Sequence, residues 1–212
     1  MCGRYAVTSA PAVLRALFGY AEQPNFPPRY NIAPTQPIAV VRPLDRKRQV
    51  ALVRWAAAVL GQGPEELHAT DQCARRERRR QAGLPRRHET AALSDPGRRL
   101  LYEWQATGGR KRPFYVQAKS GEPLALAGLW ETWMGANGEE LDTAAIVTMR
   151  ANKLIESIHD RMPLIIVPWA FELWLNSNEV DPETAAMLIK PAPEDLLEAY
   201  EIAPAGQPRR QR

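Results

Sequence analysis

Residues 113–149 read PFYVQAKSGEPLALAGLWETWMGANGEELDTAAIVTM, and this stretch decides which fold the chain is expected to adopt. It contains three apolar runs of strand length, Pro113 to Ala118, Leu124 to Trp130 and Ala144 to Met149. Glycine and charged residues separate the runs, and short apolar runs bounded by such turn signals are typical of strands. The stretch therefore predicts three strands.

Further elements are predicted outward from this stretch. Ile38 to Val41 and Val50 to Trp55 flank a charged turn and predict a hairpin, and Leu164 to Val167 predicts another short strand. Apolar spacing and capping residues predict helices at residues 10–20, 152–158, 168–175 and 182–189. The proline-rich residues 24–37 predict an extended loop. Because no strand–helix unit repeats, we expect an α+β fold with a mainly antiparallel sheet and flanking helices.

Composition narrows the class of protein. The chain has 212 residues, of which 45% are hydrophobic, and this predicts one domain over residues 1–202 with a disordered tail at 203–212. No apolar run reaches membrane-spanning length and no leader pattern opens the chain, so we expect a cytoplasmic protein, and a monomer. Two cysteines are too few for a disulfide framework, and no cluster of Cys and His has the spacing of a zinc site. We therefore expect neither a disulfide framework nor a metal, and no cofactor.

Residues 56–100 differ from the rest of the chain. They contain no Lys, Asn, Ile, Met, Phe, Tyr or Trp, but they contain nine arginines. With six acidic residues, the stretch supplies three of the chain's four net positive charges. A solvated basic arm that binds nucleic acid is one interpretation. We favour another, in which two compensating frame changes have replaced a core segment with out-of-frame, poorly ordered sequence.

Codon degeneracy is compatible with this interpretation. Reading residues 56–67 one base later allows Leu-Leu-Pro-Ser-Trp-Ala-Lys-Asp-Pro-Lys-Asn-Phe, which restores the missing aromatic and strand-forming types. Losing core strands costs about 2–5 kcal/mol per large side chain, against a domain's total stability of roughly 5–15 kcal/mol. We therefore expect this chain to fold poorly or to be inactive, and an uninterrupted reading frame in independent reads of the gene would refute the frame-change interpretation.

Cys2 follows the initiator methionine directly, and a residue this small permits removal of Met1. The resulting free N-terminal cysteine carries an amine and a thiol on neighbouring carbons. An aldehyde can form a Schiff base with this amine, whose usual pKa is roughly 7.7–8.0, and the thiol can then close a thiazolidine ring. Cys2 is therefore a candidate catalytic residue that needs no cofactor.

Five motifs occur in order: residues 1–5 (MCGRY), 29–36 (RYNIAPTQ), 102–104 (YEW), 127–131 (AGLWE) and 158–163 (IHDRMP). Together they resemble the SOS response-associated peptidase family, also called abasic site processing proteins. The resemblance spans residues 1–55 and 101 to about 200.

The resemblance implies a DNA-damage response protein. It implies binding to single-stranded DNA at abasic sites and a covalent crosslink from Cys2 to the ring-opened sugar aldehyde. Glu103 matches the family's catalytic glutamate, which suits general acid–base work. His159, the only histidine outside residues 56–100, matches the histidine that stabilises the abasic sugar.

The resemblance also implies DNA-contacting residues. Arg4 and Arg161 suit backbone phosphates, and Asn31 and Pro34 belong to a stiff loop that can border the DNA. Four tryptophans could stack on DNA bases, and they are Trp130, Trp133, Trp169 and Trp174. Their apolar neighbours favour core packing instead. The family's Asn-Ala-Arg motif has no match here.

Three readings remain open for the activity. The leading one is lyase-like crosslinking through Cys2. The second is a thiol autoprotease that removes its own Met1. The third is a non-catalytic nucleic-acid binder or a pseudogene product, and strongly salt-dependent binding without a covalent adduct would favour it.

Overall fold

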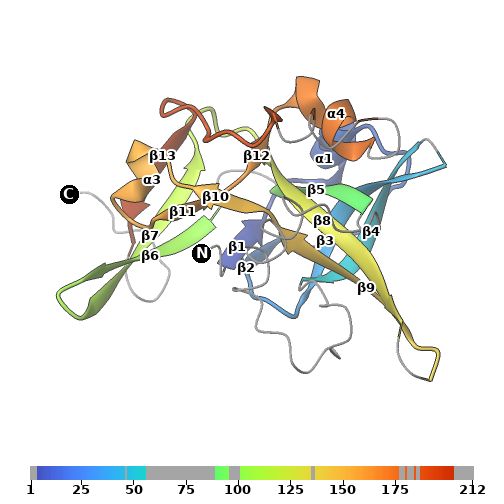
Figure 1. The fold of residues 1–212 in the computed structure, drawn as a ribbon, viewed down its shortest axis with the longest axis horizontal. Helices are drawn as coiled ribbons and strands as arrows, with labels where there is room; N and C mark the ends of the chain where they lie inside the picture. Colours follow the sequence, from blue (N-terminus) through green and yellow to red (C-terminus); the bar gives the residue numbers. More distant parts are fainter. Residues whose placement is uncertain are drawn as a thin grey trace.

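The computed structural model describes residues 4–45, 47–55, 89–95, 101–134, 137–176 and 187–202, together with Val180 and Thr184. Cys2 therefore lies outside the described residues, as do the tail from residue 203 and most of residues 56–100. Figure 1 shows two groups of strands side by side, which we call the open sheet and the barrel.

The open sheet has five strands in the order β13–β7–β6–β1–β2. Their bounds are Arg4–Val7 for β1, Arg29–Ile32 for β2, Leu101–Thr107 for β6, Arg110–Ala118 for β7 and Leu197–Glu201 for β13. All neighbouring pairs in this sheet are antiparallel. The proline-rich segment predicted as an extended loop at residues 24–37 contains the short strand β2. This strand lies at the edge of the sheet and pairs with β1 on one side.

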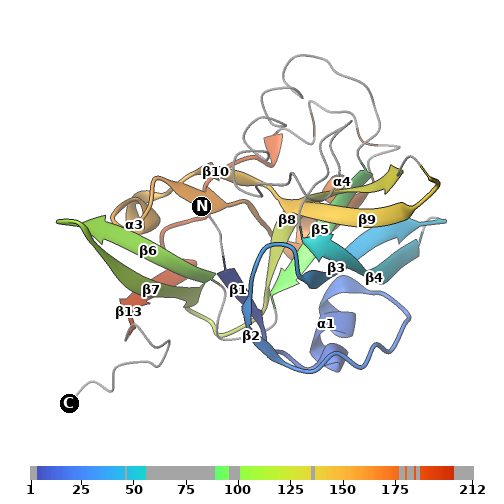
Figure 2. The ribbon, with the colours of Figure 1, turned by 90° about the horizontal axis from the view of Figure 1, so that it is seen from below.

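The barrel is a ring of five strands in the order β8–β5–β3–β4–β9. Their bounds are Pro37–Leu44 for β3, Lys47–Trp55 for β4, Glu89–Asp95 for β5, Leu124–Met134 for β8 and Glu140–Ile146 for β9. The ring closes because β9 pairs with β4 in parallel and with β8 antiparallel. The short β12, Ile165–Ile166, pairs with the start of β8. Figure 2 shows the ring from below.

Few helices cover these strands in the part of the chain that the structure describes. They are α1 at Pro11–Phe18, α3 at Lys153–Glu156, the 3₁₀ turn η2 at Pro168–Ala170 and α4 at Phe171–Leu175. Phe18 of α1 stacks on Phe171 of α4 with ring centroids 5.2 Å apart. Arg48 of β4 donates to the carbonyl oxygen of Phe18 at 2.7 Å and so joins this helix pair to the barrel. Within the described part of the chain, no helix is long and apolar enough to cross a membrane.

One aromatic contact joins the open sheet to the barrel. The rings of Tyr5 on β1 and Trp55 on β4 meet edge to face with centroids 5.1 Å apart. Both side chains are almost fully buried. The two groups of strands therefore share one hydrophobic core, and the predicted α+β class with a mainly antiparallel sheet is confirmed.

The predicted hairpin at Ile38–Val41 and Val50–Trp55 is confirmed as β3 and β4, which pair antiparallel along eight registered positions. The predicted strand Ala144–Met149 is instead two strands. Val147 interrupts it, because its N–H donates to the Ala127 carbonyl in the barrel and the chain then leaves to form β10, Thr148–Arg150. This short strand pairs with β11, Arg161–Pro163.

The expectation that residues 56–100 are poorly ordered is wrong for Glu89–Asp95. This segment forms β5, which pairs with β3 on one side and with β8 along all seven of its residues on the other. Backbone hydrogen bonds do not depend on side-chain type, so an unusual composition can still fill the gap between two strands that each offer unpaired edges. The frame-change interpretation itself stays a prediction.

The predicted helices are shorter in the structure. Residues 10–20 become α1, residues 152–158 become α3 and its following turn, and residues 168–175 become η2 and α4. Half of the helix predicted at residues 182–189 falls outside the described residues.

Candidate functional site

The strand β6 places Glu103 at the centre of the candidate site. Side chains alternate across a strand, so Leu101, Glu103 and Gln105 lie on one face and Trp104 on the other. Glu103 is only 3% exposed. Burial penalises the ionised carboxylate and raises the pKa of Glu103 to about 7. A carboxyl group with such a pKa exists in both protonation states near neutral pH and suits proton transfer.

A turn between α3 and β11 carries His159. Asn152 begins the helix: its side chain accepts from the Ile155 N–H at 3.0 Å and donates to the Ala192 carbonyl at 3.0 Å. The helix ends after Glu156, and the N–H of His159 donates back to the Ile155 carbonyl at 2.8 Å. The N-cap therefore sets the turn on which His159 is held.

A hydrogen bond and the direction of its pKa shift both favour a neutral imidazole at His159. Its Nδ1 accepts from the Arg161 N–H at 3.0 Å, which leaves Nε2 as the nitrogen that bears the proton. Burial lowers the pKa of His159, and the nearby Asp160 carboxylate opposes this shift. Nδ1 also lies 2.8 Å from Asp160 Oδ1, a contact that becomes an ion pair only on protonation. Burial has a larger effect on the pKa of His159 than the Asp160 carboxylate. We therefore assign the hydrogen bond from the Arg161 N–H to Nδ1 to the neutral imidazole, the form favoured at neutral pH.

Glu103 and His159 line one cleft of about 750 Å³. One wall is β6 from Glu103 to Thr107 with Lys111 of β7, and the other is residues 156–160. The tertiary fold therefore brings together two of the three predicted catalytic residues. Cys2, the third, is outside the described residues.

The predicted DNA-contacting residues lie in three places. Arg4 and Asn31 are joined by a hydrogen bond from Arg4 Nη1 to Asn31 Oδ1 at 3.0 Å. Arg4 also sits opposite Tyr102 in the β1–β6 ladder, one residue from Glu103. Pro34 lies in the turn between β2 and β3, where the Gln36 N–H donates to the Ala33 carbonyl and Thr35 has a φ of 74°. It is not among the residues that line the cleft.

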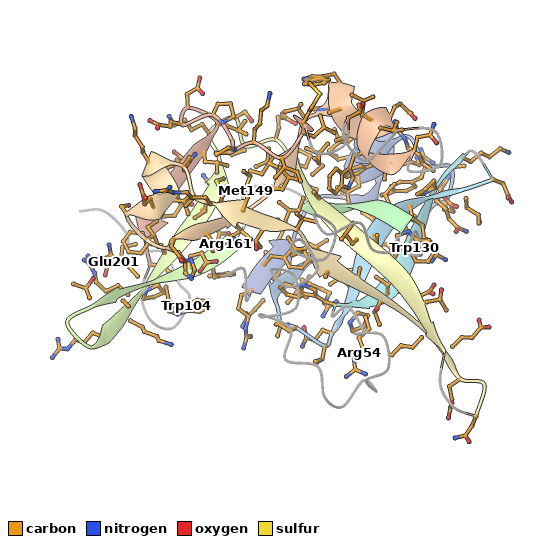
Figure 3. All side chains as sticks on the ribbon, in the orientation of Figure 1. Arg54, Trp104, Trp130, Met149, Arg161 and Glu201 are labelled. Atoms are coloured by element: carbon orange, nitrogen blue, oxygen red, sulfur yellow. The ribbon has the colours of Figure 1, made fainter. Side chains whose placement is uncertain are left out.

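Arg161 on β11 follows the histidine turn. Its guanidinium donates to Thr148 of β10 through both the carbonyl oxygen and Oγ1, the latter at 2.9 Å. These contacts orient the guanidinium, and Arg161 lies in the same half of the molecule as Trp104, as Figure 3 shows.

Core packing, the favoured expectation for the four tryptophans, is confirmed for two of them and is wrong for Trp169. Trp130 and Trp174 are buried, whereas Trp169 is 74% exposed. The side chain of Trp133 is outside the described set. Trp104 is 37% exposed and is the tryptophan among the described side chains that lines the cleft. Its motif was recognised in the sequence, but a role in the cleft was not predicted.

Sequence reasoning also missed residues that hold the site. Gln105 reaches the carbonyl oxygen of Ser157 at 2.6 Å, Thr148 holds Arg161, and Asn152 caps α3. The position of Gln105 two residues after Glu103 was the available signal, since it places both side chains on one strand face. Among the described residues, no group of three His, Cys, Asp or Glu side chains is arranged to hold a metal ion.

Comparisons with known proteins agree on one family. The family model described as SOS response associated peptidase (SRAP) matches residues 1–91 and 97–205. The abasic site processing protein YoqW of Bacillus subtilis is 28% identical over 207 residues, covering 96% of this chain and 92% of that protein. YedK of Escherichia coli, which carries the same description, is 27% identical over 197 residues, covering 84% of this chain and 81% of YedK.

Solved structures share the fold. A crystal structure of a Bordetella bronchiseptica protein superposes with a TM-score of 0.75 at 23% identity, covering 95% of this chain and all of that one. A Bacteroides thetaiotaomicron protein gives a TM-score of 0.74 at 19% identity, covering 96% of this chain and 93% of that one. Because the family model matches nearly the whole of this chain, the chain belongs to the SOS response associated peptidase (SRAP) family.

Proposed function

We propose that this protein binds single-stranded DNA at abasic sites and crosslinks covalently to the ring-opened sugar aldehyde through Cys2. The observation that carries the proposal is the cleft in which Glu103, buried and with a pKa of about 7, lies with a neutral His159. Relatives over most of this chain are named abasic site processing proteins, which supports the same substrate.

Chain geometry supports access of Cys2 to the cleft. Cys2 precedes Arg4 by two residues, so their Cα atoms are at most about 7 Å apart. Arg4 pairs with Tyr102 and Tyr5 with Leu101, so β1 and β6 run antiparallel. The chain therefore enters β1 from the side of β6 on which Glu103 lies. An N-terminal amine and thiol within this reach suit a reaction beside that carboxyl group.

The proposed reaction has two covalent steps. The α-amine of Cys2, free once Met1 is removed, adds to the aldehyde carbon to give a carbinolamine. Loss of water from the carbinolamine then forms the C=N bond of a Schiff base. In the second step the thiol sulfur adds to the imine carbon, the C=N pair moves to nitrogen, and the proton from the thiol ends on that nitrogen. The product is a thiazolidine, and no electrons are exchanged with an oxidant or reductant.

Glu103 and His159 supply the proton transfers in this proposal. Protonated Glu103 opens the sugar ring at its oxygen and later protonates the departing carbinolamine hydroxyl. The ionised form then takes a proton back. The proton on His159 Nε2 stabilises the sugar oxygens as they gain charge. Near pH 7 both groups have the forms that these steps need.

Backbone phosphates are the proposed partners of the nearby cations. Arg4 lies beside β6 with its guanidinium oriented by Asn31, and Arg161 follows the histidine turn with its guanidinium oriented by Thr148. Phosphate contacts of this kind position a strand without reading its sequence. Pro34, in the turn beyond Asn31, borders the path of the DNA in this proposal.

The test is adduct formation by the full chain. Purified protein, with removal of Met1 checked by mass spectrometry, is incubated with an oligonucleotide that carries one abasic site and is analysed on a denaturing gel. We expect a denaturation-resistant adduct that Cys2→Ser abolishes and that Cys73→Ser, the matched control, leaves intact. This result would refute the sequence-based expectation that the chain is inactive. An adduct that survives Cys2→Ser, or salt-dependent binding without any adduct, would overturn the proposal.

Self-removal of Met1 is a second proposed activity. Glu103, whose pKa is about 7, lies beside the start of β1. This position favours self-processing, because such a carboxyl group can activate a thiol or water near the N-terminus. Translation in a system that lacks methionine aminopeptidase tests it: Met1 should be lost from the parent and retained by Cys2→Ala. Loss of Met1 from neither chain, or from both, would contradict self-processing.

A further inference from the structure

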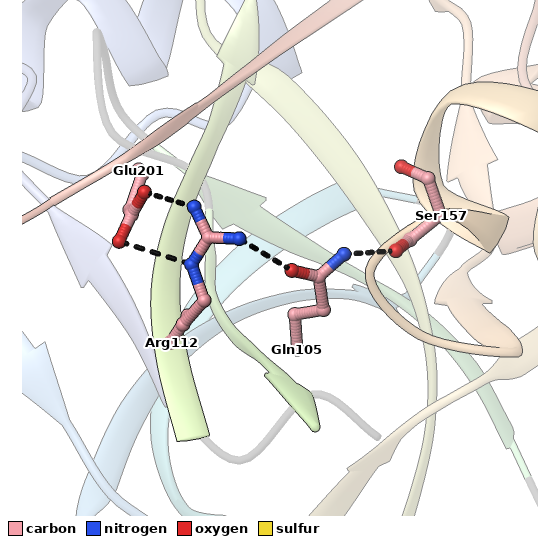
Figure 4. Close-up of polar contacts among 4 residues, drawn as sticks. All are labelled: Gln105, Arg112, Ser157 and Glu201. Atoms are coloured by element: carbon pink, nitrogen blue, oxygen red, sulfur yellow. Dashed lines mark hydrogen bonds and ion pairs between the residues drawn. The ribbon is translucent and has the colours of Figure 1, made fainter. Parts of the chain in front are cut away.

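A line of polar contacts crosses the open sheet and ends at the turn that carries His159. Figure 4 shows its four members, which are Glu201, Arg112, Gln105 and Ser157. Arg112 of β7 is held by both carboxylate oxygens of Glu201 on β13, with Nε to Oε1 at 3.2 Å. Its Nη1 donates to Gln105 Oε1 at 3.4 Å, and Gln105 Nε2 donates to the Ser157 carbonyl at 2.6 Å.

The partners dictate how the Gln105 amide is turned. A guanidinium only donates, so the amide oxygen must face Arg112, and a carbonyl only accepts, so the NH₂ group must face Ser157. Gln105 and Arg112 are also directly opposite each other in the β6–β7 ladder. The strand register and the Glu201 pair therefore orient Gln105 before it reaches the turn.

The acceptor belongs to a helix end. Ser157 is the C-cap of α3, and carbonyls at a helix C-terminus lack partners within the helix. Gln105 supplies a donor to this carbonyl from the opposite wall of the cleft. Ser157 is two residues before His159, and the next backbone N–H groups, those of Ile158 and His159, both donate to the Ile155 carbonyl. Holding the Ser157 carbonyl thus constrains the whole turn.

We propose that Gln105, oriented by Arg112, is a positioning residue that sets His159 against Glu103 by tying the two walls of the cleft together. Glu103 and Gln105 share one strand face, so the same short segment of β6 presents the carboxyl group and holds the histidine turn. The effect on crosslinking rests on the proposed function, whereas the effect on the turn does not.

The kinetic test compares Gln105→Met with the parent, since methionine keeps the length of the side chain and removes both hydrogen bonds. We expect the rate constant for adduct formation at saturating abasic DNA to fall about 3- to 10-fold, the range for losing one ordinary hydrogen bond, with half-saturation by DNA unchanged. The matched control is Gln117→Met on β7, whose side chain bonds Glu198 and Tyr200 and is not among the cleft-lining residues. It should keep the parental rate.

A double-mutant cycle separates positioning from general stability. If Gln105 acts through His159, Gln105→Met should have almost no further effect in a His159→Ala background. A full multiplication of the two effects would overturn the proposal, as would a change confined to DNA affinity.

A second measurement needs no activity. Hydrogen exchange of the amides of His159 and Arg161, which bond Ile155 and His159 Nδ1, should be several-fold faster in Gln105→Met and unchanged in Gln117→Met. Unchanged exchange in Gln105→Met would overturn the positioning role. If the parent forms no adduct but exchange accelerates as expected, the proposed function fails and the positioning role stands.

Discussion

Among the described side chains, the open sheet differs from the barrel in that it buries a carboxyl group beside its apolar residues. In the barrel, β3 buries four consecutive apolar residues, Ile38 to Val41, and β8 buries Leu126 and Ala127 completely. In the open sheet, β6 buries the carboxyl group of Glu103. The buried polar residue of the barrel is Thr143 on β9, whose side chain carries no carboxyl group.

The difference separates stability from chemistry. Apolar burial contributes roughly 25 cal/mol per Å² removed from water, whereas burying a group that ionises costs free energy and shifts its pKa. The apolar core that the two regions share therefore supplies the stability that allows β6 to keep a reactive carboxyl group out of water. Substitutions in the two regions should separate activity from stability accordingly.

Glu103→Gln should give the largest effect on activity. The amide keeps the shape of the side chain but cannot donate and accept a proton in turn, so adduct formation should slow by about 10²–10⁴-fold. The free energy of unfolding should stay the same or rise, because no charge is then buried. Single-turnover adduct assays and urea denaturation measure both quantities. A variant that unfolds readily would show instead that Glu103 acts as a structural residue.

Leu126→Ala should do the reverse in the barrel. Leu126 is fully buried on β8 and lies opposite Ile165 of β12 and Leu93 of β5 in the ladders. Removing its side chain leaves a cavity and should cost about 2–5 kcal/mol of unfolding free energy. Leu52→Ala on β4, at a position that is 57% exposed, is the control and should cost less than about 0.5 kcal/mol. Comparable costs at the two positions would contradict the barrel core described above.

Stability should depend on pH through Glu103. Its pKa is raised from 4.5 to about 7 in the folded protein, so the folded state binds the proton more tightly than the unfolded state. The stabilisation is fully present below pH 4.5 and is lost as pH rises through about 7. At roughly 1.4 kcal/mol per pH unit, the loss relative to Glu103→Gln is on the order of 3 kcal/mol. Urea denaturation of both proteins at several pH values tests this, and parallel pH curves would contradict it.

Asp142→Asn should have the smallest of these effects. In the barrel, Asp142 accepts from Arg42 at 2.8 Å and from Thr132 at 2.6 Å, and the Arg42 guanidinium also lies 4.1 Å from the Trp130 ring centroid. Weakening this partly buried network should cost about 1.5–3 kcal/mol of unfolding free energy and leave crosslinking unchanged.

The matched control is the exposed ion pair of Arg150 and Glu156, beside the cleft. Arg150→Ala should change stability by less than about 1 kcal/mol, since an exposed pair gains little in water. A larger cost for Arg150→Ala than for Asp142→Asn in the same denaturation series would reverse the expected ranking.

Local patterns in the sequence predicted much of the barrel. Ile38–Val41, Val50–Trp55 and Leu124–Trp130 are apolar runs bounded by turn signals, and each is a strand in the structure. The open sheet was predicted less well, because β6 mixes Glu103 and Gln105 with aromatic residues and has no clear apolar alternation. The strand β5 was missed because its place depends on the edges of β3 and β8 rather than on its own composition.

Which reactive groups this protein has follows from its residues alone. Cys2 as a potential aminothiol, and the glutamate and histidine within family motifs, are properties of residues and their order. How those groups behave depends on the way the chain packs. Burial, which depends on every element packed around β6, raises the pKa of Glu103, and chain folding brings Gln105 to Ser157 across 52 residues. Residue identity is covalent, whereas dielectric environment and proximity arise only when distant segments pack together.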